Sequence, residues 1–283
     1  MSHPDDGRLK FLRVQTDRPR RRFRRGVYLL PSLLTLGNMF CGYACVVYAM
    51  RGEYATAAPF IGFAIVLDIL DGRIARLTGT ASDFGVEFDS LADVISFGIA
   101  PAILSFSWGL LPLGRLGWAA GFMFVTAAAM RLARFNIQTA AGGDKRYFVG
   151  MPSPAAAAVP AATVYFYPSG LYDYREALPA LAMVLVPAVL MVSTIRFRSF
   201  KTIDLQSRRR YTVLILIAAG IALIATHPRF VLVAAAYSYL ASAFVGMAIT
   251  RFRRRGGRLP ADEILSPPDE ASNRGANRSG SAR

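Results

Sequence analysis

The chain has 283 residues, 54% of them hydrophobic, and its 33 lysines and arginines exceed its 18 acidic residues to give a net charge of +15. Apolar runs this long and this numerous exclude an ordinary soluble protein of one or two domains. The basic residues cluster beside the apolar runs, as in cytoplasmic loops of membrane proteins, so nucleic-acid binding is not expected.

Residues 1–26 form a polar, strongly basic N-terminal segment. We expect this tail to be largely disordered. The more specific alternative is a helix on the membrane surface after about Arg18. Cys41 and Cys45, the only two cysteines, follow inside the first apolar run, where buried free thiols are expected and no disulfide framework is indicated.

Eight apolar spans predict an all-α, polytopic membrane helix bundle. They lie at about residues 29–50, 55–77, 88–110, 118–137, 154–167, 177–195, 211–226 and 230–250. The fifth and seventh spans are short, and the fifth is rich in alanine and proline, which favours a helix buried among others. Residues 27–255 would thus form one transmembrane domain, and the polar, aperiodic residues 256–283 a disordered tail.

The distribution of arginine and lysine predicts the orientation of these spans. One side of the bundle carries the basic N-terminal tail, Lys145 and Arg146, and the basic runs at 196–210 and 251–255. The loops on the other side hold only isolated arginines. The positive-inside rule therefore places both termini in the cytoplasm, with the link between the second and third spans near the cytoplasmic face.

Four aspartates interrupt the second and third spans. A charged side chain at the centre of a membrane helix costs about 2.5 to 3.5 kcal/mol, so such residues usually face a cavity and serve chemistry or transport. Asp68 and Asp71 are three residues apart, and Asp89 and Asp93 four apart, so each pair shares a helix face. A close pair of like charges repels by about 4 kcal/mol at an effective dielectric of about 20.

This repulsion means that either some of the carboxyl groups stay protonated or a cation lies among them. Oxygen ligands suit Mg²⁺, Mn²⁺ or Ca²⁺. Two aspartate pairs could hold two such ions, an arrangement that clamps the attacking and leaving oxygens in phosphoryl transfer.

The complete pattern is DxxDGxxARx8GxxxDxxxD, and it resembles the signature of the CDP-alcohol phosphotransferase family without departure. Its fixed positions are Asp68, Asp71, Gly72, Ala75, Arg76, Gly85, Asp89 and Asp93. The resemblance implies two divalent ions, Mg²⁺ or Mn²⁺, held by Asp68, Asp71 and Asp89, with Asp93 completing the set and serving as general base. It also implies a homodimer.

The same resemblance implies a nucleotide site. That site would consist of Asp68, Gly72, Ala75, Arg76 and Gly85. The small residues allow close approach of a ligand, and the planar guanidinium of Arg76 fits diphosphate oxygens. Pairing of Arg76 with an aspartate is the alternative.

Four further segments, at residues 33–42, 84–101, 131–136 and 148–154, resemble the phosphatidylserine synthase branch of the family. Met151 stands where leucine is common. This branch implies CDP-diacylglycerol and L-serine as substrates and CMP as a product. The positive-inside rule places the aspartate cluster, and with it the active site, near the cytoplasmic face of the inner membrane. Cationic candidates for serine's carboxylate or a lipid phosphate are Arg131, Arg134, Lys145, Arg146, Arg196 and Lys201.

Taken singly, each of these cations is better explained as a positive-inside anchor that meets lipid phosphate. Arg131 and Arg134 share a helix face within an apolar span and have the strongest functional case. Alternative functions are a sister enzyme using inositol phosphate, glycerol phosphate or choline, a cation transporter, and a membrane scaffold with a structural ion cluster. The absence of an inverted repeat argues against the transporter.

Overall fold

The computed structural model describes residues 25–79, 82–140, 147–193, 196–198, 218–220, 222–223 and 225–256. Most of both predicted tails and most of the predicted seventh span lie outside the described residues. Disorder of the tails and a surface helix after Arg18 therefore remain predictions.

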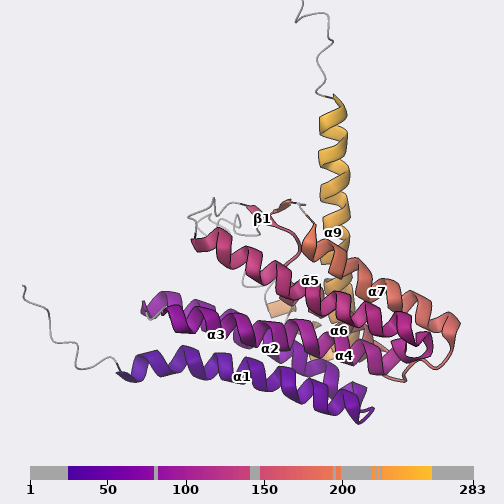
Figure 1. Cartoon of the computed structure of the whole chain (residues 1–283), viewed down its shortest axis with the longest axis horizontal. Coiled ribbons are helices and arrows are strands. Elements are labelled where there is room, and N and C mark those ends of the chain that lie inside the picture. The colour runs from indigo at the N-terminus through magenta and orange to yellow at the C-terminus, as the bar shows by residue number, and fades with distance from the viewer. Residues whose placement is uncertain are drawn as a thin grey trace, which may run out of the picture.

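The first two helices form an antiparallel pair (Figure 1). Helix α1 runs over Arg25–Met50 and α2 over Tyr54–Thr78, with Gly52 at φ 78° in the short link. The α2 face that packs inward is made largely of small residues, including Ala57 and Ala64, which are fully buried. Small side chains let membrane helices approach closely.

The third span is one continuous helical stretch in which the type of helix changes four times. It comprises α3 (Asp83–Asp93), η1 (Val94–Ile99), α4 (Ala100–Ser105), η2 (Phe106–Leu110) and η3 (Leu111–Leu113). Both η1 and η2 are π-helical, and η3 is a 3₁₀ turn. The stretch begins five residues before the predicted boundary because the Ser82 side chain caps it, accepting a 3.0 Å hydrogen bond from the Gly85 amide.

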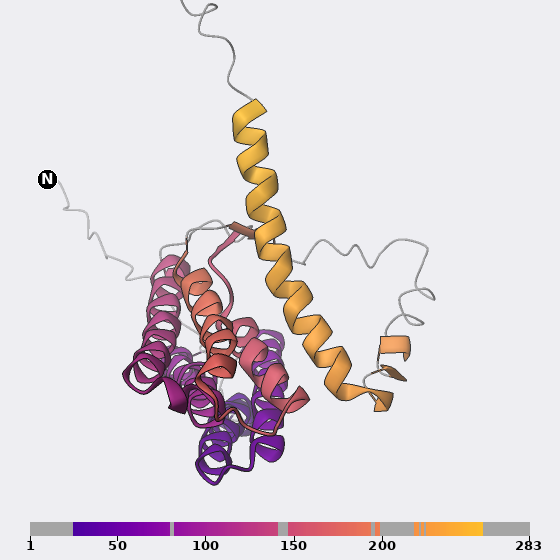
Figure 2. The same ribbon diagram turned by 90° about the vertical axis from the view of Figure 1, so that its right-hand side faces the viewer.

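The remaining helices are α5, α6, α7 and α9. Their bounds are Arg115–Ala140, Ser153–Phe166, Tyr174–Val192 and Pro228–Gly256. Helices α1 to α7 run roughly side by side, whereas α9 crosses them and extends beyond the bundle (Figures 1 and 2). Among the described residues, two three-residue strands depart from the all-α expectation: β1 (Tyr147–Val149) pairs antiparallel with β2 (Arg196–Arg198).

Five described helical segments are long and apolar enough to cross a membrane, and they identify an integral membrane protein. They are Pro31–Met50, Tyr54–Thr78, Asp83–Leu113, Arg115–Gln138 and Tyr174–Val192. Helix α6 has only 14 residues, with most side chains buried, which confirms the prediction of a short helix enclosed by others. The all-α membrane bundle is thus confirmed, while the count of eight spans and the orientation of the termini remain predictions.

Candidate active site

Helices α2 and α3 bring three carboxylates together. Asp68 and Asp71 lie on one face of α2, and Asp89 lies on the facing side of α3. One carboxylate oxygen from each of the three lies within 4.8 Å of the others. Asp93, the last residue of α3, lies outside this group but close enough to interact electrostatically with Asp68 and Asp89.

The three grouped carboxylates are removed from solvent to different degrees. Asp71 is buried, at 4% exposure, while Asp68 and Asp89 are half-buried. The Oδ1 atom of Asp89 is buried and has no hydrogen-bond partner among the described residues. A buried carboxylate oxygen without a donor is costly unless a proton or a cation is close to it.

This donor set fits a divalent cation. All three carboxylates offer hard oxygen ligands, the kind that Mg²⁺, Mn²⁺ and Ca²⁺ accept. A cation beside the Oδ1 of Asp89 would satisfy that atom and offset the repulsion among the three acids.

Helix α1 supplies hydrogen-bond donors to one acid on each of the other two helices. The Thr35 hydroxyl donates to Oδ2 of Asp71 at 3.0 Å. The Asn38 amide donates to Oδ1 of Asp93 at 3.3 Å. Both donors are buried and lie three residues apart, on one face of α1. Helix α1 therefore fixes the orientation of the two buried acids.

The contact between α1 and the third span depends on a glycine. A Cβ atom built on Gly42 would lie 2.6 Å from Ser96 Oγ and 2.8 Å from Ser96 Cα. Ser96, in η1, donates its hydroxyl proton to the Asn38 carbonyl at 2.9 Å. Because Gly42 has no side chain, the two backbones approach closely enough for Asn38 to reach Asp93.

Arg131 on α5 contributes a cation to the acidic cluster. Its guanidinium is near enough to Asp68 and Asp93 for electrostatic interaction. One of its nitrogens donates to Ser153 Oγ, at the start of α6, at 2.9 Å. The guanidinium also lies 5.4 Å from the centre of the Phe135 ring. These contacts hold a positive charge at the edge of the acidic cluster.

Of the five other predicted cations, two lie within the described residues. Arg134 is exposed on α5, and the backbone of Arg196 is in β2. Lys145, Arg146 and Lys201 lie outside the described residues.

The residues predicted to bind nucleotide line the α2 and α3 ends near the acids. A Cβ atom at Gly72 would meet nothing within 4 Å, so the surface there is open. Arg76 is exposed, and its Nε donates to the Gly72 carbonyl at 2.7 Å instead of to a carboxylate. Ala75 and Gly85 are half-buried.

Sequence reasoning assigned no role to four polar residues that contact the acids or their partners. These residues are Thr35, Asn38, Ser96 and Ser153. The available signal was the presence of polar side chains inside apolar spans, which in a membrane usually indicates an internal partner.

Similar proteins carry names that agree with this chemistry. The chain is 39% identical to the CDP-diacylglycerol–serine O-phosphatidyltransferase of Helicobacter pylori over 195 residues, 68% of this chain and 81% of that protein. It is 38% identical to the archaetidylserine synthase of Methanothermobacter thermautotrophicus over 170 residues, 59% and 69% of the two chains. A CDP-diacylglycerol–serine O-phosphatidyltransferase of Bacillus subtilis is 34% identical over 127 residues, 45% and 70% of the two chains.

The sequence profile of CDP-alcohol phosphatidyltransferases matches residues 28–195, more than half of the chain and the part that holds every described residue of the acidic site. Members of this family are in general metal-dependent, in agreement with the donor set of Asp68, Asp71 and Asp89. The chain belongs to the CDP-alcohol phosphatidyltransferase family.

Proposed function

We propose that this protein transfers the phosphatidyl group of CDP-diacylglycerol to the hydroxyl of L-serine and releases CMP. The observation that carries the proposal is the meeting of three carboxylates beside Asp93 and Arg131 within apolar helices. The names of the relatives support serine as the acceptor, since the bacterial and archaeal proteins differ in the lipid they name but share serine.

Asp68, Asp71 and Asp89 would hold divalent metal, Mg²⁺ or Mn²⁺, and Asp93 would complete the set if two ions bind. When bound, such ions neutralise the diphosphate and stabilise the negative charge on the departing CMP. The buried, unpartnered Oδ1 of Asp89 is the feature of this chain that best supports metal binding.

Asp93 is the proposed general base. The serine hydroxyl oxygen forms a bond to the phosphorus that carries the lipid, and the bond from this phosphorus to the bridging oxygen breaks. The electron pair of that bond leaves with CMP, and the hydroxyl proton passes to Asp93. The hydrogen bond from Asn38 to Oδ1 orients the Asp93 carboxylate for this transfer.

The cytidine diphosphate and the serine carboxylate would bind at two further places. Gly72, Ala75, Arg76 and Gly85, with Asp68, would contact the cytidine diphosphate, and the open space at Gly72 supports this placement. Arg131 would bind the serine carboxylate, which its planar fork suits. Arg134, Arg146, Arg196 and Lys201 would then meet lipid phosphates at the membrane surface.

We further propose that the active site lies near the cytoplasmic face of the inner membrane, with both termini in the cytoplasm, and that the protein is a homodimer. The basic runs that precede α1, follow α5 and α7, and form the C-terminal end of α9 support the orientation.

The test is CMP release by the purified full-length protein from CDP-diacylglycerol, with serine, inositol phosphate, glycerol phosphate or choline as acceptor. We expect release with serine, loss of release in EDTA, and recovery with Mg²⁺ or Mn²⁺. Release with another acceptor alone would refute the choice of serine. No release with any acceptor, together with cation flux in liposomes lacking nucleotide, would instead support a transporter.

A further inference from the structure

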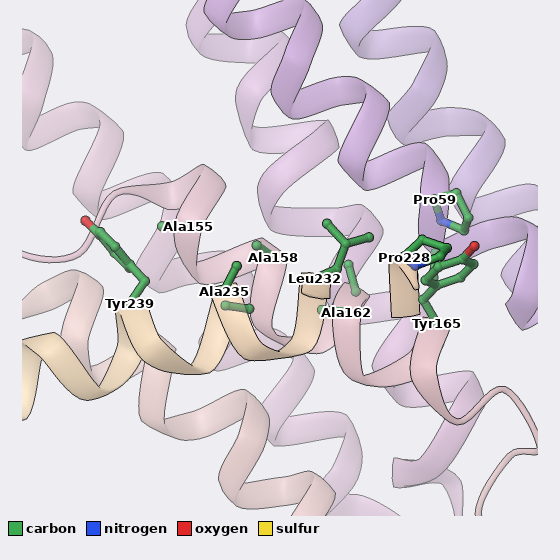
Figure 3. Close-up of a pocket in the computed structure, with 12 residues that line it drawn as sticks. Pro59, Ala155, Ala158, Ala162, Tyr165, Pro228, Leu232, Ala235 and Tyr239 are labelled. Carbon is green, nitrogen blue, oxygen red and sulfur yellow. The ribbon is translucent and has the colours of Figure 1, made fainter. Parts of the chain in front are cut away.

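A cavity of about 340 Å³ lies between α2, α6 and α9, and none of the four aspartates of the acidic site lines it. Figure 3 shows its side chains, with Tyr165, Pro59 and Pro228 gathered at one end and Tyr239 at the other. Seven of its twelve lining residues are alanine: Ala58, Ala155, Ala158, Ala161, Ala162, Ala235 and Ala236. Because these side chains are small, the space between α6 and α9 is not filled by protein atoms.

The cavity is a groove that is open along one side. Ala161 and Ala162 on α6 are buried and form its floor, whereas Ala235 and Leu232 on α9 are exposed, the latter at 42%. From Ala155 to Tyr165 the floor is about 15 Å long at 1.5 Å per helical residue. An apolar, elongated groove with an open side suits a flexible hydrocarbon chain that enters laterally from a bilayer.

One end of the groove approaches the acidic site. The hydroxyl of Tyr239 is within electrostatic range of the Arg131 guanidinium. Arg131 in turn donates to Ser153, at the start of the same helix that forms the groove floor, and lies near Asp68 and Asp93. A lipid whose phosphates lie at the acids, next to the serine that Arg131 would bind, and whose apolar body runs along α6 would match the polarity of this surface.

We propose that this groove holds one acyl chain of the CDP-diacylglycerol donor, and that α9 thereby selects for acyl-chain length. The proposal rests on the proposed function, because it takes the donor lipid as the occupant. The α9 wall lies beyond residues 28–195, the part that matches the family profile, whereas the α2 and α6 walls lie within it.

The test compares two donors, CDP-dioleoylglycerol and CDP-dioctanoylglycerol, with serine as acceptor and the full-length protein. Ala158→Leu and Ala235→Leu fill the groove from α6 and from α9. We expect each to lower kcat/KM at least tenfold for the long-chain donor and less than twofold for the short-chain donor. Ala241→Leu is the matched control, because Ala241 is exposed on α9 and does not line the groove.

An equal effect on both donors, or none on either, would overturn the proposal. So would an Ala235→Leu variant that changes the oligomeric mass without changing the ratio between donors, since the occupant would then be a second copy of the chain.

Photolabelling with a CDP-lipid that carries a diazirine on its acyl chain gives a readout independent of serine. Adducts on α6 and on α9 at Leu232 or Ala235 are expected, and adducts confined to other helices would refute the groove. If the unmodified protein releases no CMP with any acceptor, the proposed function fails, while the labelling pattern still decides whether the lipid occupies the groove.

Discussion

Asn38 and Asp93 lie 55 residues apart in the chain, and the side-chain amide of Asn38 donates a 3.3 Å hydrogen bond to Oδ1 of Asp93. Both side chains are buried, Asn38 completely. The carbonyl of Asn38 accepts from Ser96, so this α1 residue is fixed on both its backbone and its side chain. The contact joins the first span to the proposed base in the third.

Replacing Asn38 should lower turnover more than it lowers substrate binding. Asn38→Ala removes a buried donor to a carboxylate, an effect of about 1.5 to 3 kcal/mol, so kcat for CMP release should fall about ten- to a hundredfold. Asn38→Asp should be more harmful, because it places a second negative charge beside Asp93. A normal kcat in a folded Asn38→Ala protein would show that this contact does not position the base.

Thr35 should tune the affinity for metal through Asp71. Partners that orient metal ligands typically contribute about 10- to 100-fold to metal affinity. Thr35→Val keeps the shape of the side chain but removes the hydroxyl that donates to Oδ2 of Asp71, so activation should require at least about tenfold more Mn²⁺. Thr35→Ser, which retains the hydroxyl, should behave like the original protein in the same titration.

The three-carboxylate group should show opposite stability effects with and without metal. In EDTA, Asp89→Asn removes one of three crowded charges and should raise the melting temperature. With Mn²⁺ present, the same variant should lose both the metal-induced stabilisation and CMP release. Glu87→Gln, an exposed change on the same helix, is the control and should leave both quantities unaltered. Equal metal-induced stabilisation in Asp89→Asn and the original protein would argue against a metal at this group.

Arg131 and Arg134 provide a matched pair for testing acceptor binding. Arg131→Gln removes the charge near Asp68 and Asp93 and the donor to Ser153, so KM for serine should rise about ten- to a hundredfold. Arg131→Lys should recover only part of this loss, because an ammonium cannot reproduce the planar fork. Arg134→Gln, at an exposed position, should change KM less than about twofold. Equal effects of both glutamine variants would place the serine site elsewhere.

Gly42 should tolerate no side chain. A Cβ atom there would collide with the Ser96 backbone, so Gly42→Ala should lower the free energy of unfolding by about 1 to 3 kcal/mol and reduce activity through the Asn38 contact. Gly62→Ala is the control, since a Cβ atom at Gly62 meets nothing within 4 Å. It should be neutral or stabilising by up to about 1 kcal/mol. Chemical unfolding in detergent measures both.

Much of the fold follows from the length of the apolar runs. The predicted span at 55–77 corresponds closely to α2, Tyr54–Thr78, because a helix needs about 20 residues to cross the bilayer. The meeting of Asp68, Asp71 and Asp89 could also be anticipated, since three- and four-residue spacings define helix faces.

The partners of the acids could not be predicted in the same way. Thr35 lies 36 residues from Asp71, and Ser96 lies 58 residues from Asn38, so these pairs depend on how α1 packs against two other helices. The groove beside α6 depends likewise on where α9 crosses the bundle. No local pattern in the sequence encodes such crossings.

The π-helical segment η1 begins directly after Asp93, and it limits how the length of the third span can change in related sequences. A π turn accommodates one more residue than an α turn over a similar rise. Losing a single residue from Val94–Ile99 would therefore convert the wide turn to an ordinary one and rotate Ser96 away from α1, while α3 stayed intact. Length variants in this segment should thus leave Asp89 and Asp93 on their helix yet break the contact between Ser96 and Asn38 of the first span.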